Sequence, residues 1–346
     1  MNQHKIKCYI IFVINVLILC IVTACDHTYS PEEQLKLYGS GVVFVVNEQH
    51  YSISYNGDAF FWFSNYSDEG EIEGLTDQED SVITIVTMGT GFFVSKDGKI
   101  VTTNQVINPK FNDKSITQNK SAILKKLHRI IITEISNYND TLDILHNRIS
   151  NIKNYSEYTE LMGQMSYFVN KRNKFNKYSN LLFQTPSIFT INRCSQLSVS
   201  YQRAKPTEIR GLVSCKILDS DPIHNLALIQ LNNDITPAHC YIFPITTKDI
   251  DTNNNQVLYL IGFAIESGNL TTINNTKAQI TTGTIIQNTD SIKITFNSPF
   301  LQCSSGSPIL NDKGQLVAIN KTGINASQTF NYGIKVKYLP TSWIIM

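Results

Sequence analysis

Apolar residues come in short alternating or continuous runs in two parts of the chain, from about residue 41 to 106 and from residue 186 onward. Clusters of turn residues separate these runs. Examples of the runs are residues 42–46, 82–86 and 258–261, and examples of the turns are residues 56–58, 96–98 and 312–314. Short β-rich runs at this spacing predict closed antiparallel sheets, so we expect a mainly β protein.

Between residues 110 and 185 the pattern changes to the period of a helix. Apolar residues recur there at alternating steps of three and four, which is typical of a coiled-coil seam. The seam comprises Leu124, Ile131, Ile135, Tyr138, Leu142, Leu145, Ile149 and Ile152, with His128 in one slot, and then Tyr158, Leu161, Met165, Phe168, Phe175 and Leu182. The break near residues 154–157 has an Asn and Glu spacing that suits a helix start. We therefore predict a hairpin of two antiparallel helices.

Two roles stay open for this predicted hairpin. Its apolar stripe either does no more than pair the two helices, or it belongs to an arm that binds a partner or covers a neighbouring site. The hairpin is basic within a chain of net charge +1, which favours contact with an anionic membrane surface. The cations are Lys125, Lys126, Arg129, Lys171, Arg172, Lys174 and Lys177.

The N-terminal segment has the pattern of a signal peptide for export. An apolar run from Tyr9 to Val22 follows basic residues, and it has the length of a signal peptide rather than of a membrane span. The run ends Val-Thr-Ala before Cys25, which resembles the lipobox where bacterial lipoproteins are cleaved and acylated. We expect residues 1–24 to be the signal peptide and residues 25–40 a lipid-anchored tether. The protein is then a membrane-anchored lipoprotein of the bacterial cell envelope, on its periplasmic or extracellular side.

Composition fits a globular protein and points to no bound group. The 346 residues are 42% hydrophobic and 16% charged, which is enough apolar material for a core. The sequence has no metal-ligand spacing, no phosphate-cradling glycine loop and no strongly basic stretch typical of nucleic-acid binding. We expect no cofactor, no metal and no nucleic-acid partner.

Three segments in fixed order carry a family resemblance. Residues 89–107 have the sequence GTGFFVSKDGKIVTTNQVI, residues 219–231 have DSDPIHNLALIQL, and residues 303–320 have CSSGSPILNDKGQLVAIN. Together they resemble the trypsin-like serine peptidases, especially the protease domain of the bacterial HtrA/Deg envelope type, here without a PDZ domain. The resemblance implies two antiparallel six-stranded β-barrels with the site in the cleft between them. It assigns residues 41–109 and 186–232 to the first barrel, residues 110–185 to the helical insertion and residues 233–346 to the second barrel.

The resemblance also assigns the site residues. Ser305 stands at the position of the nucleophile, Gln105 at that of the histidine and Asn225 at that of the aspartate. Cys303 occupies a glycine position of the oxyanion hole, where we expect its side chain to disfavour the backbone orientation that glycine adopts. A glutamine has no basic lone pair near neutral pH, so Gln105 cannot take the proton of the serine. Asn225 keeps the shape of an aspartate without its charge, and a Gln105–Asn225 amide pair would satisfy both side chains.

These substitutions predict a catalytically impaired pseudoprotease that binds a peptide or protein in the inter-barrel cleft or on the helical arm. The alternative is an active serine endopeptidase in which a non-standard base activates Ser305. His224 lies next to Asn225, but neighbouring strand side chains point to opposite faces, which argues against His224 as that base. Cys194 and Cys215 flank an expected turn at residues 203–206, so they are candidates for a disulfide, with free thiols as the alternative.

Overall fold

The computed structural model describes residues 28–108, 113–202, 211–246, 248, 250, 252–264, 277–288, 290–299, 301–321 and 331–343. The predicted signal peptide, Cys25 and the turn at residues 203–206 lie outside these ranges. The chain divides into two compact units, which we describe separately. The barrel unit comprises Met1–Val46, Met88–Ile107 and Leu197–Met346, and the helical unit comprises Asn47–Thr87 and Asn108–Gln196.

Six strands close the first sheet into a barrel. Their order is β1-β5-β6-β9-β8-β7, and a further pairing of β1 with β7 completes the ring, while β2 extends the sheet beyond β1. The strands are β1 (Val42–Tyr55), β2 (Asp58–Phe63), β5 (Ile85–Phe93), β6 (Lys99–Thr102), β7 (Phe189–Tyr201), β8 (Val213–Asp221) and β9 (Leu226–Leu231). Alternate apolar residues fill the interior, among them Val43, Val45, Phe93, Ile100 and Ile229, each fully buried.

The second sheet is a closed barrel in the order β10-β11-β12-β15-β14-β13. Its strands are β10 (Val257–Gly262), β11 (Gln279–Gln287), β12 (Lys293–Asn297), β13 (Pro308–Asn311), β14 (Leu316–Lys321) and β15 (Asn331–Lys335). Short 3₁₀ helices also occur at Gly39–Gly41, Glu79–Ser81, Pro186–Ile188, Val336–Tyr338 and Thr341–Trp343. The predicted fold class, mainly β with two six-stranded antiparallel barrels and an inserted helical hairpin, is confirmed.

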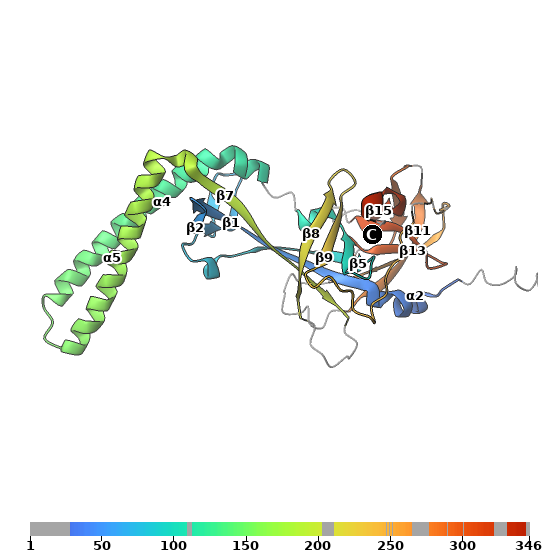
Figure 1. The fold of residues 1–346 in the computed structure, drawn as a ribbon, viewed down its shortest axis with the longest axis horizontal. Coiled ribbons are helices and arrows are strands. Elements are labelled where there is room, and N and C mark those ends of the chain that lie inside the picture. Colours follow the sequence, from blue (N-terminus) through green and yellow to red (C-terminus); the bar gives the residue numbers. More distant parts are fainter. Residues whose placement is uncertain are drawn as a thin grey trace, which may run out of the picture. The chain divides into compact units, whose positions relative to one another are not determined.

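The inserted hairpin consists of α4 (Asp113–Ile149) and α5 (Tyr155–Gln184), which run side by side (Figure 1). Asn154 caps α5 because its side chain accepts a hydrogen bond from the backbone N–H of Ser156, so the predicted helix start is confirmed. Half of the predicted seam is buried: Leu124, Ile131, Leu142, Leu145, Leu161, Phe175 and Leu182. His128 fills its seam slot with a contact of 3.1 Å between its Nε2 and Ser179 Oγ.

Aromatic side chains join the hairpin to the strands of the helical unit. Phe60 on β2 stacks on Tyr178 of α5 with ring centroids 4.0 Å apart, and Phe61 meets Phe175 edge-on at 5.4 Å. The unit also contains the short pair β3 (Asn65–Tyr66) and β4 (Ile72–Glu73). The prediction that residues 41–109 all belong to the first barrel is therefore wrong for Asn47–Thr87, because the outer half of β1 and β2 pack against the helices.

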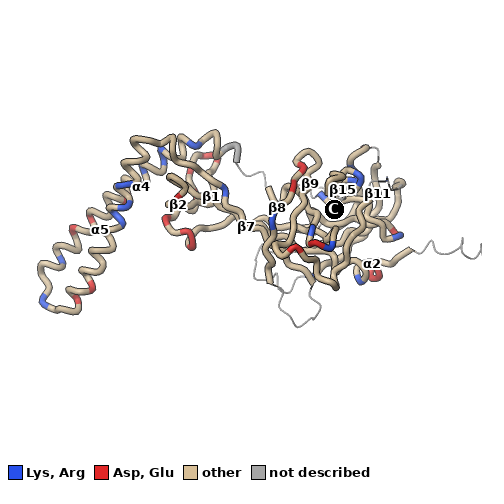
Figure 2. Tube along the Cα trace, viewed as in Figure 1, with Lys and Arg blue, Asp and Glu red and all other residues tan. Residues whose placement is uncertain are grey.

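Ion pairs add to these apolar contacts. Asp77 lies 2.5 Å from Lys171 Nζ and 3.4 Å from Lys174 Nζ, both on α5. Burial acts to raise the pKa of Asp77, but hydrogen bonding and attraction to the two lysines outweigh it, so the pKa lies below its ordinary value. Acidic as well as basic residues lie along the hairpin (Figure 2). Asp77 pairs with two of the predicted cations, Lys171 and Lys174, so part of the basic character is neutralised within the unit.

The segment predicted as a tether is partly a docked helix, α2 (Pro31–Tyr38). Ser30 and Glu33 form a reciprocal capping box at its start. Gln34 is fully buried and donates through Nε2 to the carbonyl of Asn311 at 2.9 Å. Tyr38 packs edge-on against Tyr241 with centroids 4.9 Å apart. The tether prediction is wrong for this stretch, because one face of a locally polar segment finds buried partners on the barrel unit.

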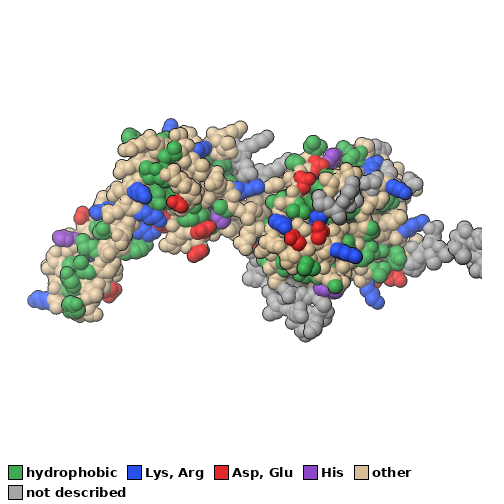
Figure 3. Space-filling view, in the orientation of Figure 1, with side chains coloured by type: hydrophobic (Ala, Val, Ile, Leu, Met, Phe, Trp, Pro, Cys, Tyr) green, Lys and Arg blue, Asp and Glu red, His purple; other side chains and the backbone are tan. Residues whose placement is uncertain are grey.

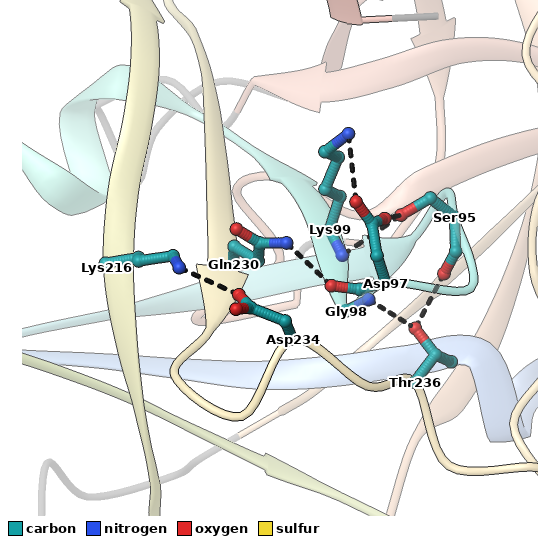
Figure 4. A network of polar contacts seen from close by, with 8 residues as sticks. All are labelled: Ser95, Asp97, Gly98, Lys99, Lys216, Gln230, Asp234 and Thr236. Atoms are coloured by element: carbon teal, nitrogen blue, oxygen red, sulfur yellow. Dashed lines mark hydrogen bonds and ion pairs between the residues drawn. The ribbon is translucent and has the colours of Figure 1, made fainter. Parts of the chain in front are cut away.

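A polar network fixes the turn between β5 and β6 (Figure 4). Thr236 Oγ1 accepts from the backbone N–H of Gly98 at 3.1 Å and donates to the carbonyl of Ser95 at 2.6 Å. Asp97 accepts from Ser95 and pairs with Lys99 at 3.1 Å. Burial acts to raise the pKa of Asp97, but these hydrogen bonds outweigh it and hold the pKa below its ordinary value. These bonds therefore fix the turn from which β6 begins.

Cys194, Cys215, Cys240 and Cys303 are free, so of the two alternatives for Cys194 and Cys215 the structure has the free thiols. Cys194 Sγ donates to Ser52 Oγ at 3.6 Å, and Cys215 packs against the core of the first barrel. Burial raises the pKa of the Cys215 thiol to about 12. Within the described ranges, no helix combines the length and the apolar character that a membrane crossing requires.

Replacing Phe175 with alanine should lower the free energy of unfolding by about 3–5 kcal/mol, because the ring is 4% exposed among aromatic neighbours. Phe183→Ala on the same helix is the matched control, since that ring is 78% exposed, and should change stability by no more than about 0.5 kcal/mol. Urea titration followed by circular dichroism measures both. Equal losses would show that the aromatic cluster does not hold the helical unit together.

Candidate functional site

The pairing of β6 with β9 brings two segments of the site to one edge of the first barrel. Thr102 lies opposite Ala227 in this antiparallel register. The paired strands end just beyond this pair. Thr103 to Gln105 follow β6 there, and Asn225 lies before β9, so the two segments meet. Gln105 lies in the short helix α3 (Asn104–Ile107).

Three hydrogen bonds join these segments. The backbone N–H of Asn104 donates to the carbonyl of Asn225 at 3.1 Å, and that of Gln105 donates to Asn225 Oδ1 at 2.9 Å. Asn225 Nδ2 donates in turn to Gln105 Oε1 at 3.2 Å. Asn225 has a φ of +58°, in the left-handed region that asparagine tolerates better than most residues.

Ser305 completes the chain of contacts from the second barrel. Gln105 Nε2 donates to Ser305 Oγ at 2.6 Å, and Thr103 Oγ1 lies 3.0 Å from the same oxygen. Ser305 is 5% exposed and Thr103 is fully buried. The structure thus brings Ser305, Gln105 and Asn225 together through side-chain hydrogen bonds.

The direction of the bonds that run from Asn225 through Gln105 to Ser305 follows from the backbone N–H of Gln105. A backbone N–H can only donate, so Asn225 must turn Oδ1 toward the N–H of Gln105 and Nδ2 toward its side chain. An amide nitrogen needs an acceptor, which leaves Gln105 Oε1 facing Asn225 and Nε2 facing Ser305. Ser305 Oγ therefore accepts a hydrogen bond from Gln105, whereas a nucleophilic serine must donate its proton to a base.

The turn that carries Ser305 is fixed to both barrels. The backbone N–H of Thr90, on β5, donates to the carbonyl of Ser305 at 2.8 Å, and the N–H of Gly306 donates to the carbonyl of Asn320 at 2.8 Å. Gly306 has a φ of +92°, and a Cβ at this position would lie 2.0 Å from the carbonyl oxygen of Thr90. Only glycine fits this conformation and approach.

Cys303 adopts a φ of +68° despite its side chain, so it does take a backbone conformation that favours glycine. Its carbonyl accepts from Thr90 Oγ1 at 2.8 Å, which fixes the peptide that follows. Burial raises the pKa of the Cys303 thiol to about 11, so the sulfur is protonated at neutral pH and is not a thiolate nucleophile.

No imidazole or amine within the described ranges hydrogen-bonds to Ser305. His224 Nδ1 lies 2.6 Å from Asp221 Oδ2, and its ring packs against Tyr338 at 5.2 Å. His224 lies in the turn before β9 rather than in a strand, so strand alternation does not set the direction of its side chain, contrary to the expectation from the sequence. His239 Nε2 contacts the carbonyl of Gln202 at 2.6 Å. The described part of the chain also holds no cluster of His, Cys, Asp and Glu suited to a metal.

Sequence analysis missed Thr103 and Thr90. Both have side-chain or backbone contacts with the segment that carries Ser305. Neither position is fixed by the motifs, and the only signal was the pair of threonines, Thr102 and Thr103, at the end of a predicted strand.

Comparison with known proteins agrees with this architecture. The family described as trypsin-like peptidase domain matches residues 188–319, which is less than half of the chain. Together with the two six-stranded barrels, this match gives the chain the fold of a trypsin-like serine peptidase. No curated protein matches the chain.

One solved structure with similarity is the crystal structure of the serine endoprotease from Yersinia pestis. The sequence identity is 14% and the TM-score is 0.42, with 89% of this chain and 62% of that chain covered. This chain therefore spans less than two thirds of the length of that one. A likeness this weak says nothing about activity.

Gly306→Ala should lower the free energy of unfolding by at least about 2 kcal/mol, because it adds both a left-handed alanine and a clash with the Thr90 carbonyl. Gly163→Ala is the control: Gly163 lies within α5 with open space around it, so alanine should stabilise by about 1 kcal/mol. Thermal unfolding of the two variants should shift in opposite directions. If Gly306→Ala leaves the unfolding temperature unchanged, the turn is not fixed as described.

Proposed function

We propose that this protein is a non-catalytic trypsin-like module of HtrA/Deg type, anchored in the bacterial envelope, that binds an extended peptide or a protein partner. One observation carries the proposal: Gln105 Nε2 donates a hydrogen bond to Ser305 Oγ. Acyl transfer needs a base that accepts the serine proton, and a primary amide is not basic at neutral pH. What remains without that base is a rate about 10³–10⁴-fold above water, which an ordinary assay would miss.

The way the amides pair further supports a settled non-catalytic state. Asn225, 9% exposed, and Gln105 satisfy each other, and neither leaves a buried charge. An aspartate at position 225 beside glutamine would accept where asparagine donates, so it would force the Gln105 amide to turn over. The two replacements are therefore matched in shape and in hydrogen-bond direction.

Reactivity toward a fluorophosphonate probe should return only when both positions are changed. In Gln105→His alone, Asn225 Nδ2 would donate to the imidazole, placing its proton on the nitrogen that faces Ser305. In Asn225→Asp alone, no base is present. The double variant should label at least about 10³-fold faster than either single variant.

Labelling is read by gel fluorescence on the intact chain, with Ser305→Ala in the double variant as the control for site specificity. If the natural sequence itself labels, and Ser305→Ala abolishes that labelling, the protein is an active serine endopeptidase. If the double variant stays unlabelled, the amide network is not what prevents activity.

Binding at the inter-barrel site is supported by the origin of its residues, since Gln105 and Asn225 belong to the first barrel and Ser305 to the second. The helical arm offers a second surface. Apolar side chains are exposed toward the end of the hairpin where α4 leads into α5 (Figure 3). They include Ile144, Tyr155, Tyr158 and Met162.

The proposed anchor is the lipobox-like Cys25. Tyr29 donates through its backbone N–H to the carbonyl of Asp312 at 2.8 Å, so the chain is already fixed to the barrel unit four residues later. Four residues reach at most about 14 Å, which would hold this part of the second barrel close to the bilayer. The tether would be short, and it would restrict the orientation of the barrel unit relative to the bilayer.

Replacing Cys25 with alanine should move the protein from the membrane fraction to the soluble fraction and abolish incorporation of labelled palmitate. Cys303→Ala, which leaves the N-terminus intact, is the matched control and should keep both properties. Labelling of the Cys25→Ala protein would place the acyl chain elsewhere, and an unlabelled natural protein would contradict the anchor.

A further inference from the structure

Ser305 Oγ has a second hydrogen-bond partner besides Gln105, and this partner is Thr103. Thr103 Oγ1 lies 3.0 Å from Ser305 Oγ, and Thr103 is fully buried. A hydroxyl group can donate one hydrogen bond and accept two. Because Gln105 Nε2 already donates to Ser305 Oγ, the direction of the bond with Thr103 decides how the serine oxygen uses its second lone pair.

Burial decides which of the two hydroxyls is the donor. In the described part of the chain, Thr103 Oγ1 has no hydrogen bond other than the one with Ser305. If Ser305 were the donor, the Thr103 proton would be buried without an acceptor, which is costly. If Thr103 is the donor, the proton left over belongs to Ser305, which is 5% exposed where Thr103 is not exposed at all. The bond therefore runs from Thr103 to Ser305.

Backbone and side-chain bonds hold Thr103 beside the serine. Thr103 follows β6, and its carbonyl accepts from the backbone N–H of Val106 at 3.1 Å. The preceding Thr102 is fully buried and donates through Oγ1 to the carbonyl of Thr90 at 2.8 Å. Thr90 in turn donates through its backbone N–H to the carbonyl of Ser305 at 2.8 Å. None of these bonds uses the glutamine side chain, so we expect the contact to persist when that side chain is replaced.

We infer that Thr103 is a positioning residue that occupies the second lone pair of Ser305 Oγ. The inference rests on the proposed function and deepens it, because it gives a second reason why Ser305 is not a nucleophile. Gln105 and Thr103 together take both lone pairs, and the serine proton points away from both donors. A nucleophile attacks with a lone pair, and here neither is free. The missing base is therefore not the only obstacle to catalysis.

Carbon-13 NMR tests the direction of the bond in the natural chain, independently of any activity. A hydroxyl that exchanges slowly gives two Cβ lines in an equal mixture of light and heavy water, whereas fast exchange gives one line. With threonine and serine carrying carbon-13 at Cβ in the intact chain, Thr103 should give two lines and Ser305 one. Thr103→Val and Ser305→Ala assign the signals. Two lines from Ser305 and one from Thr103 would overturn the inference.

Fluorophosphonate labelling of the Gln105→His, Asn225→Asp double variant measures the consequence. Ser305 Oγ bonds to phosphorus as the P–F bond breaks, fluoride leaves, and the introduced imidazole takes the serine proton. The bond from Thr103 weakens as the lone pair moves to phosphorus, so it stabilises the starting state more than the transition state. Adding Thr103→Val should therefore speed labelling about three- to tenfold, as expected for one net hydrogen bond.

Thr103→Ser in the same background is the conservative variant, and it should return the rate to that of the double variant because it keeps the hydroxyl. Equal thermal unfolding of the chains with valine, serine and threonine at this position shows that the rates do not report a change in folding. A loss of packing alone would slow labelling in both variants, whereas the inference predicts faster labelling with valine only.

The outcomes separate this inference from the proposed function. If Thr103→Val leaves the labelling rate unchanged or lowers it, the inference is wrong while the non-catalytic proposal stands. If no variant labels, the account of the amide network is wrong, and the NMR lines of Thr103 and Ser305 decide the inference by themselves. If the natural chain labels at Ser305, the non-catalytic proposal and the inference are both wrong.

Discussion

The backbone N–H of Gln105 sets the direction of the hydrogen bonds that run from Asn225 through Gln105 to Ser305. Because it can only donate, it fixes which atom of Asn225 faces it, and through Asn225 it fixes how the Gln105 amide is turned. The serine oxygen at the end of this chain is an acceptor from Gln105 as a result. The arrangement of these three positions alone does not decide whether Ser305 can act as a nucleophile. That depends on the direction of the hydrogen bonds between them.

The rest of the barrel unit holds this chain in place. The register of β6 with β9 sets Gln105 beside Asn225, and Thr90 on β5 bonds to the turn of the second barrel that carries Ser305. Gly306 allows the close approach on which that second contact depends. The arrangement of the three site positions is thus kept by backbone contacts that do not involve the side chains of Gln105 and Asn225.

The sequence was sufficient for the fold class, because the spacing of apolar residues indicates β-strands and helices, and three motifs in fixed order carry the resemblance that implies two barrels. It did not predict the docking of α2, since the partner of Gln34 is the carbonyl of Asn311, far away in the chain. It placed residues 47–87 in the barrel because β1 is one strand of 14 residues that begins in the barrel unit and ends in the helical unit. The sequence also did not predict how the amides of Gln105 and Asn225 are turned, because that depends on the backbone N–H of Gln105, which faces Asn225 only in the fold.

The matched amides also bear on how such a chain can evolve. A glutamine codon becomes a histidine codon, and an asparagine codon an aspartate codon, by one nucleotide change each. Neither step alone gives the serine a base that can take its proton, so selection for peptidase activity would have no gain to act on after the first mutation. For the non-catalytic module proposed above, the hydrogen-bond direction at Asn225 would thus make a change of ligand easier than a gain of peptidase activity.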